Sequence, residues 1–353
     1  MTRRDILKFA GSAPAILAAA PPQSAAVQPS SRMGVASSAL SNRTRLKSGG
    51  PAGPAASNPL EDLEYCRQIG AGGLQSGFGQ LDGNGIRQLR RKTEEYGMYF
   101  EAALSMPRGE TDLRRFQEDV QKARSAGATV IRSVMLSGRR YETFTSAEAF
   151  QNFKTQSWLS LTAAEPVLRK SRIRLALENH KDWRIDEMTG MLKRISSEFI
   201  GACVDVGNNV ALLEDPVELA QALAPYAYSA HLKDMGVKQY EDGFLLSEVV
   251  FGEGFLDLKK IVQILRQAQP NLRFSLEMIT RDPLQIPCLT EGYWATFDNL
   301  PGRDLARTLT TVRTKQRSEP LPTVSQLSLE ERVKVEEENN VKCLLYARDQ
   351  LGI

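Results

Sequence analysis

The amino-acid sequence predicts an α/β protein of the (β/α)8 barrel class, and three observations support this. Eight short apolar runs, each the length of a buried strand, recur between positions 33 and 279. Amphipathic stretches with helical periodicity separate them, and repeated strand–helix pairs favour a barrel over an open sheet. The chain has 353 residues, 42% hydrophobic and 25% charged. This composition is ordinary for a globular protein and excludes disordered, collagen-like and coiled-coil chains.

The apolar runs and the periodic stretches place the individual elements. The expected strands are 33–37, 73–78, 98–104, 129–136, 173–179, 201–206, 229–233 and 274–279. The expected helices are 60–69, 86–96, 113–126, 185–196, 216–223 and 258–267. Asp112 and Asp257 are suited to helix N-caps, and Gly97 and Gly127 to helix C-termini.

Three segments lie outside the repeat. Residues 237–254 follow the seventh strand, and their Gly and Tyr content indicates a hairpin. Residues 281–301 follow the eighth strand and form a long predicted loop on the same face. Residues 328–351 have a charged helical pattern. This last helix either closes the barrel or provides a contact in a homo-oligomer.

The N-terminus has the features of an export signal. Arg3 and Arg4 form a twin-arginine pair, and the uncharged stretch up to about residue 20 is too short to span a bilayer. We therefore predict a twin-arginine signal peptide and leader over 1–30, a catalytic barrel over 31–318, and a linker and helix over 319–353. The mature protein is expected to be periplasmic or secreted, without a stable membrane anchor.

Charge and rare residue types limit the classes of function. The sequence has 45 Lys and Arg against 42 Asp and Glu, and this near balance gives no support to a nucleic-acid partner. The only histidines are His180 and His231, which excludes a site built from clustered imidazoles. The cysteines are too few and too scattered for a disulfide framework or a CxxC zinc site. They are Cys66, Cys203, Cys288 and Cys343.

Polar residues at the ends of four consecutive strands mark the candidate active site. In barrel enzymes, functional groups lie where strands end and βα loops begin. Three buried carboxylates are costly unless a positive charge compensates them, and one His with a nearby Lys does not suffice. Three oxygen donors and one imidazole suit Mn²⁺, Mg²⁺, Co²⁺ or Zn²⁺. We therefore predict one divalent metal ion, held by the residues that end strands five to eight. These are Glu178, Asp205, His231 and Glu277.

With these four residues, the sequence resembles the xylose isomerase-like TIM barrel superfamily, the sugar phosphate isomerase and epimerase group. The resemblance extends over roughly residues 33–279. That group places Glu, Asp, His and Glu on consecutive late strands around one metal. Residues 252–257 resemble its Gly-acidic-Gly turn. The group includes epimerases, isomerases, dehydratases and lyases, so the resemblance does not identify the substrate.

The chain also departs from this group. Asn208 stands where many members have a His, three residues after the strand-six Asp. No phosphate cradle is evident near the last two strands, which together with export favours a neutral or oxidised sugar over a phosphosugar. The apurinic endonucleases of the same fold use several His, and a chain with two argues against DNA repair.

The resemblance implies proton transfer next to a carbonyl. A metal chelated by the carbonyl and the adjacent hydroxyl stabilises an enediolate, while one carboxylate removes a proton and another returns it. By analogy with the epimerases, Glu178 and Glu277 are the catalytic pair, and Asp205 and His231 are mainly metal ligands.

Four further residues are candidate substrate contacts. His180 is placed to bind a hydroxyl, Lys233 or Arg281 to bind a substrate oxygen, and Trp183 to stack on a sugar ring. Each has a structural alternative, such as an ion pair between Lys233 and Asp234. The expected function is a metal-dependent isomerase or epimerase acting on a small sugar or sugar derivative. The alternatives are a lyase or dehydratase acting on a keto-sugar or 3-keto-glycoside, and a non-catalytic sugar-binding barrel.

Overall fold

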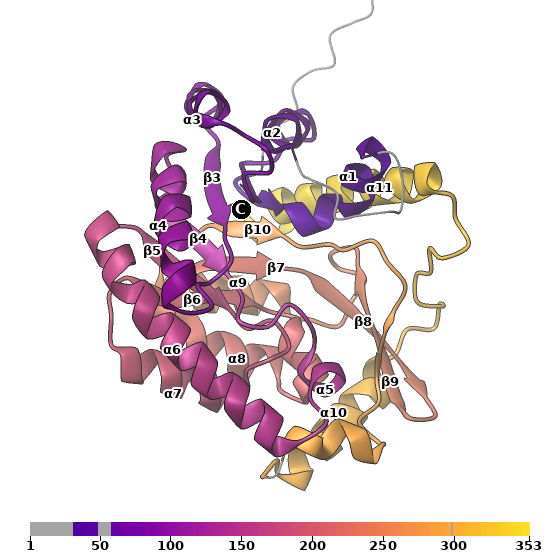
Figure 1. Ribbon diagram of the computed structural model, residues 1–353. Coiled ribbons are helices and arrows are strands. Elements are labelled where there is room, and N and C mark those ends of the chain that lie inside the picture. Colours follow the sequence, from indigo (N-terminus) through magenta and orange to yellow (C-terminus); the bar gives the residue numbers. More distant parts are fainter. Residues whose placement is uncertain (1–30, 49–57, 298) are drawn as a thin grey trace, which may run out of the picture.

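The computed structural model describes residues 31–48, 58–297 and 299–353 (Figure 1). In this part of the chain, eight parallel strands close a barrel in the order β1-β10-β7-β6-β5-β4-β3-β2. The predicted (β/α)8 barrel is therefore confirmed. The predicted signal peptide and leader, 1–30, lie outside the described residues. Among the described helices, none is both long and apolar enough to cross a membrane.

The barrel strands are short and almost wholly buried, and each lies in or overlaps one of the eight predicted runs. They are β1 (Gly34–Ala36), β2 (Gly73–Ser76), β3 (Tyr99–Ala103), β4 (Val130–Ser133), β5 (Arg174–Glu178), β6 (Ile200–Asp205), β7 (Ala227–Leu232) and β10 (Phe274–Leu276). Even the three-residue β1 pairs on both sides, because Val35 is in register with Leu74 of β2 and with Leu276 of β10. This double pairing closes the barrel.

Alternation along the strands decides which side chains enter the barrel. Leu175 and Leu177 of β5 pack in the main apolar core, whereas Ala176 belongs to a small separate cluster with Val130 and Cys203. Successive side chains of a strand point to opposite faces. Glu178 therefore lies on the same face as Ala176, inside the barrel and at its carboxyl end.

Helices surround the strands and cover the outer face of the barrel (Figure 1). The helices at the predicted positions are α2 (Pro59–Gln68), α3 (Gly83–Tyr96), α4 (Glu110–Ser125), α7 (Ile185–Ile195), α8 (Pro216–Leu223) and α9 (Leu258–Ala268). The sequence pattern did not single out α1 (Ser41–Lys47), α5 (Arg140–Thr143), α6 (Ala147–Ser171) and α10 (Gly302–Lys315). Helix α6 is the longest helix of the described chain. Its exposed Leu159 and internal Pro166 interrupt the helical periodicity of the apolar residues, so the sequence pattern did not predict it.

The predicted helix ends are correct with one exception. Asp257 caps α9 by accepting the backbone N–H of Lys260, and Gly97 takes a left-handed conformation at the end of α3. Asp112 is not an N-cap, because α4 begins two residues earlier. Its carboxylate accepts the backbone N–H of Arg108 and pairs with Arg115 instead.

The predicted hairpin after the seventh strand is present. Strands β8 (Asp234–Tyr240) and β9 (Gly243–Val249) pair antiparallel, and β11 (Leu284–Ile286), from the long loop after β10, adds a third strand. The carboxylate of Asp234 accepts backbone N–H groups from Gly252 and Gly254. It thereby fixes the glycine-containing turn that leads from the hairpin to α9.

The C-terminal helix lies beside the first strand. Helix α11 (Leu329–Tyr346) packs against α1, and one turn of π-helix, η5 (Ala347–Leu351), follows it. Glu336 of α11 is 1% exposed, and its carboxylate accepts the backbone N–H groups of Asn42 and Arg43 in the first turn of α1. The predicted C-terminal helix is therefore present and is tied to the N-terminal helix α1, and its role in a homo-oligomer stays a prediction.

We predict that Glu336→Ala lowers the free energy of unfolding by about 2–3 kcal/mol, because it leaves buried donors at the start of α1 without an acceptor. Urea unfolding followed by circular dichroism measures the change. Glu338→Ala, at an exposed position of the same helix, is the matched control and should change stability by less than about 0.5 kcal/mol. Equal midpoints for the two variants would contradict the capping role.

Candidate metal centre

Four side chains from the last four barrel strands meet inside the barrel at its carboxyl end. Glu178 and Asp205 end β5 and β6, His231 is the penultimate residue of β7, and Glu277 directly follows β10. All four are at most 3% exposed. One ligand atom of each lies within 4.8 Å of the others. The structure thus brings together the four residues that the sequence singled out.

The imidazole of His231 faces the three carboxylates. Its Nδ1 lies 3.3 Å from Oε2 of Glu178, 3.5 Å from Oε2 of Glu277 and 3.6 Å from Oδ2 of Asp205. The same nitrogen has no hydrogen-bond partner. On the other side of the ring, Nε2 donates to Oε1 of Gln75 over 2.7 Å. When the ring is uncharged, its proton lies on Nε2 and the Nδ1 lone pair faces three anions. Burial lowers the pKa of His231, but its acidic neighbours outweigh burial and hold this pKa well above its usual value.

This arrangement fits a divalent metal ion. A nitrogen lone pair and three carboxylates repel one another in a buried space unless a cation lies between them. One imidazole nitrogen and three carboxylate oxygens form a donor set that first-row divalent ions and Mg²⁺ accept. Among the described residues, two overlapping groups could hold such an ion, and the larger consists of Glu178, Asp205, His231 and Glu277. The smaller joins Cys203 to Glu178 and His231.

A buried polar layer holds the imidazole in place. The side-chain amide of Gln75 in β2 donates to Glu101 in β3 over 3.0 Å, and the hydroxyl of Ser229 donates to the same carboxylate over 2.6 Å. This fixes the Gln75 amide with its oxygen toward His231. Burial raises the pKa of Glu101. These residues were not predicted as part of the site. A polar residue within an otherwise apolar strand would have indicated them.

Two basic side chains keep the outer carboxylates ionised. Arg132 of β4 lies 2.5 Å from Oε2 of Glu178, and Lys233 lies 2.5 Å from Oε2 of Glu277 and 2.7 Å from Oδ2 of Asp205. Burial disfavours a charged carboxylate, but Lys233 and His231 outweigh it and hold the pKa of Glu277 well below its usual range. Burial also raises the pKa of Glu178, but the neighbouring Arg132 outweighs this effect and lowers the pKa below its usual value. Both groups are therefore charged at neutral pH.

The alternative role predicted for Lys233, an ion pair with Asp234, is wrong. The Lys233 side chain points into the barrel toward the metal-centre carboxylates, whereas Asp234 binds backbone N–H groups of the turn after β9. Arg132, which lies one residue before the end of β4, was not predicted as a site residue. Its partner Glu178 is 46 residues away in the chain, so no local pattern relates the two.

Asn208 and Lys181 form a second polar link beside the cluster. The Asn208 amide donates to Glu178 over 3.3 Å, and its oxygen accepts from both Lys181 and Lys233. Lys181 is 3% exposed and has no carboxylate partner among the described residues. Burial, reinforced by repulsion from Lys233 and Arg281, lowers the pKa of Lys181 to about 8. This lysine was not predicted as a site residue.

The other predicted substrate contacts lie around this centre. Nδ1 of the half-buried His180 donates to the carbonyl of Leu136 over 3.0 Å, which leaves Nε2 as an acceptor. Arg281 lies 2.5 Å from the buried Glu248. Trp183 is 3% exposed and stacks on Phe153, so the wall of the site covers most of its ring. Substrate contact by His180, Lys233, Arg281 and Trp183 stays a prediction.

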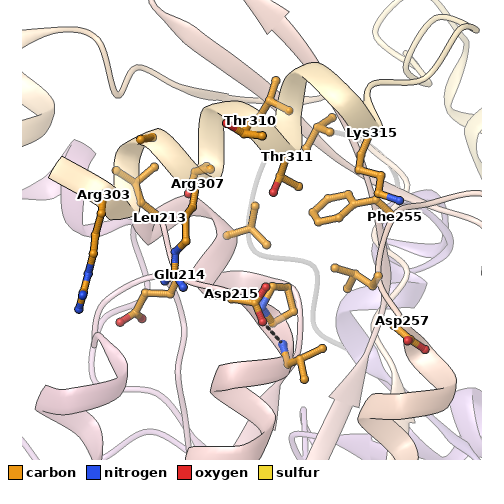
Figure 2. A pocket seen from close by; sticks show the side chains of 18 residues that line it. Leu213, Glu214, Asp215, Phe255, Asp257, Arg303, Arg307, Thr310, Thr311 and Lys315 are labelled. Carbon is orange, nitrogen blue, oxygen red and sulfur yellow. Dashed lines mark hydrogen bonds between the residues drawn. The ribbon is translucent and has the colours of Figure 1, made fainter. Parts of the chain in front are cut away.

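Two cavities open near the carboxyl end of the barrel. The larger, about 660 Å³, lies under α10, with Leu213 and Phe255 in its walls and Arg307 and Lys315 at its edge (Figure 2). None of the four clustered side chains lines it. The smaller, about 360 Å³, is lined by residues that follow β1 and β10. It includes Ser38, whose hydroxyl donates to Glu277 over 2.8 Å, so this cavity borders the metal centre.

Comparison with known proteins agrees with the barrel. The family model described as xylose isomerase-like TIM barrel matches residues 63–296. A 3-oxo-isoapionate decarboxylase from Pectobacterium atrosepticum is 30% identical over 114 residues, which are 32% of this chain and 42% of that enzyme. The chain thus matches less than half the length of this curated relative.

Solved structures share the fold at low sequence identity. A xylose isomerase-like TIM barrel protein from Mycobacterium smegmatis, in complex with magnesium, has a TM-score of 0.53 at 17% identity, covering 78% of this chain and 97% of its own. D-psicose 3-epimerase, solved in the presence of D-fructose, has a TM-score of 0.57 at 11% identity, covering 85% and 95%. At these identities the likeness establishes the architecture alone.

We predict that His231→Ala removes most of the bound metal and that Gln75→Met weakens metal binding about 10- to 100-fold, because the ring loses the acceptor that orients it. Calorimetric titration of the chelator-treated protein with Mn²⁺ measures both changes. Gln151→Met, at an exposed position of α6, is the control and should bind like the unaltered protein. Unchanged metal content in His231→Ala would refute its assignment as a ligand.

Proposed function

The chain belongs to the xylose isomerase-like TIM barrel family, and we propose that it is a divalent-metal-dependent enzyme that moves a proton next to the carbonyl of a sugar. The proposed reaction is that of an isomerase or epimerase. One observation carries this proposal: three buried carboxylates converge on the free Nδ1 of His231 at the carboxyl end of the barrel. Carboxylates held in this way provide both metal ligands and groups that accept protons.

The proposed ligands are Glu178, Asp205, His231 and Glu277. A divalent ion bound by them polarises a carbonyl and lowers the free energy of the enediolate formed from it. Magnesium in the fold-related protein from Mycobacterium smegmatis supports a divalent ion, and the donor set also suits Mn²⁺, Co²⁺ and Zn²⁺.

We assign proton transfer to Glu178 and Glu277. They follow β5 and β10, which are separated in the barrel by β6 and β7, so the two carboxylates approach the centre from different sides. Their ion pairs with Arg132 and Lys233 keep both groups charged and able to accept a proton from carbon. In an epimerase, one carboxylate removes the proton from one face of the substrate. The other, once it has taken up a proton from solvent, supplies that proton as a carboxylic acid to the opposite face.

A lyase or decarboxylase is the second candidate. The curated relative is a 3-oxo-isoapionate decarboxylase, and its match to this chain favours an enzyme of this kind. Loss of carbon dioxide from a 3-oxo acid leaves the electron pair of the broken bond on an enolate. The same centre stabilises that enolate, and a carboxylic acid then protonates its carbon. The two candidates therefore share an intermediate and differ in the group that leaves.

We also propose that the protein is exported. Arg3 and Arg4 precede a short uncharged segment with small residues at its end. Replacing both by Lys should keep the protein in the cytoplasm, since transport by the twin-arginine route depends on the pair. Cell fractionation and immunoblotting measure the distribution, with Arg32→Lys as the control. Unchanged export of the double variant would contradict this assignment.

The central prediction concerns Glu277. In deuterated water with Mn²⁺, the enzyme should place deuterium in recovered or epimerised D-fructose, and Glu277→Gln should lower this exchange by about 10²-fold or more. Nuclear magnetic resonance and mass spectrometry of the sugar measure the exchange. Glu118→Gln, at an exposed position of α4, is the control.

The same experiment separates the alternatives. An active Glu277→Gln variant would refute the acid–base role of this residue. Release of water or carbon dioxide from keto-sugars or keto-glycosides would support the lyase. Sugar binding without exchange or release would support a non-catalytic barrel.

A further inference from the structure

Apart from the imidazole of His231, the charged side chains buried around the metal centre sum to zero before any divalent ion is counted. Four carboxylates and four basic side chains lie together at the carboxyl end of the barrel. The carboxylates are Glu178, Asp205, Glu248 and Glu277, and the basic side chains are Arg132, Lys181, Lys233 and Arg281. A bound divalent ion therefore leaves an excess of two positive charges. Such an excess is costly in a buried site and favours an anionic ligand.

Two other buried acids near this centre offset only part of the excess positive charge. Burial raises the pKa of Asp182 to about 7 and also raises the pKa of Glu101, which favours their uncharged forms. Lys181 shows the unpaired positive charge most clearly. Its buried ammonium group donates to the Asn208 amide, and no carboxylate of the described chain pairs with it.

The cavity that borders the metal centre is itself basic. Three arginines line it, Arg45, Arg281 and Arg332, against one acid, Asp282. That acid is already engaged, because its Oδ1 accepts the backbone N–H groups of Val324 and Ser325. The carbonyl groups of Ser325 and Leu327 hold the guanidinium of Arg332 in place. Neither Arg45 nor Arg332 has a carboxylate partner in the part of the chain that the structure describes.

Contacts at the wall of this cavity connect it to the proposed catalytic carboxylate. Ser38 lines the cavity and donates to Glu277, and Arg281 lies four residues after Glu277 in the chain. None of the four clustered side chains lines the cavity, but Ser38 alone separates it from the carboxylate of Glu277, so a ligand bound there lies directly beside the metal centre. In the cavity, this ligand meets guanidinium groups, which bind carboxylates through paired hydrogen bonds.

We propose that the substrate is a sugar acid, with its carbonyl at the metal centre and its carboxylate in the cavity of Arg45, Arg281 and Arg332. This inference rests on the proposed function and narrows its substrate class. We favour a carboxylate over a phosphate, because phosphate sites commonly add backbone N–H groups to basic side chains, and the first N–H groups of α1 are already bound by Glu336.

Three sugars that differ only at C6 test the proposal: D-fructose, D-fructuronate and D-fructose 6-phosphate. Calorimetric titration of the Mg²⁺-loaded protein should show D-fructuronate binding at least about tenfold more tightly than D-fructose. Arg45→Gln and Arg332→Gln should each weaken the binding of D-fructuronate more than that of D-fructose, and so reduce this preference. Arg45 is exposed, so its variant reports on the pocket even where loss of Arg332 disturbs the fold. Arg114→Gln, on α4, is the control and should keep the full preference.

The outcomes separate this inference from the proposed function. Equal affinity for D-fructose and D-fructuronate, or a preference for the phosphate, overturns the sugar-acid assignment even where deuterium exchange occurs. A carboxylate preference that persists in both arginine variants also overturns it. Tight D-fructuronate binding that depends on Arg45, without deuterium exchange, supports the pocket and contradicts the proposed reaction.

Discussion

The repulsion between the free Nδ1 of His231 and three carboxylates is the constraint on which the rest of the site depends. Such a cluster is stable in a buried space only if cations offset it and its members cannot move apart. Arg132 and Lys233 supply positive charge beside the carboxylates, and the space between the four side chains is where the proposed metal ion would lie. The hydrogen-bonded series from Glu101 through Gln75 to His231 prevents the ring from turning its lone pair away.

The fold supplies the rigidity that this cluster requires. The ligands come from adjacent strands, and closing the barrel fixes the distances between them. The barrel closes at β1, which pairs with β2 on one side and β10 on the other. Because β1 has only three residues, few backbone hydrogen bonds hold this part of the barrel together. Helix α11 covers this seam, and Glu336 ties it to α1 through backbone hydrogen bonds. A C-terminal segment remote from the chemistry thus supports the strand beside Glu277.

The sequence was sufficient for the barrel and for the four clustered residues, but not for their partners. Strand ends carry a local signal, because a polar residue terminates an apolar run, as Glu178 does in β5. Gln75 and His231 are 156 residues apart, and Arg132 and Glu178 are 46 apart, so only the closed barrel relates them. The same limit explains Lys233, whose sequence neighbour Asp234 was the obvious partner but whose side chain lies on the other side of the backbone. Helix α6 was missed for a different reason, because an exposed leucine and an internal proline obscure its periodicity.

The proposed ligands do not by themselves decide the reaction. An epimerase and a decarboxylase of this design both need an enolate held at the same centre, and they differ in which bond gives up its electrons. That choice depends on where the rest of the substrate lies relative to the centre, and hence on the loops after the strands. Here those loops contribute two buried basic groups, Lys181 after β5 and Arg281 after β10, and Arg281 is paired with Glu248 of β9. For the proposed sugar acid, a carboxylate held in the cavity beside Glu277 would keep its C–C bond away from the centre, as an epimerase requires. In a decarboxylase, the carboxylate would have to lie next to the carbonyl at the centre, so that its C–C bond is the one that breaks.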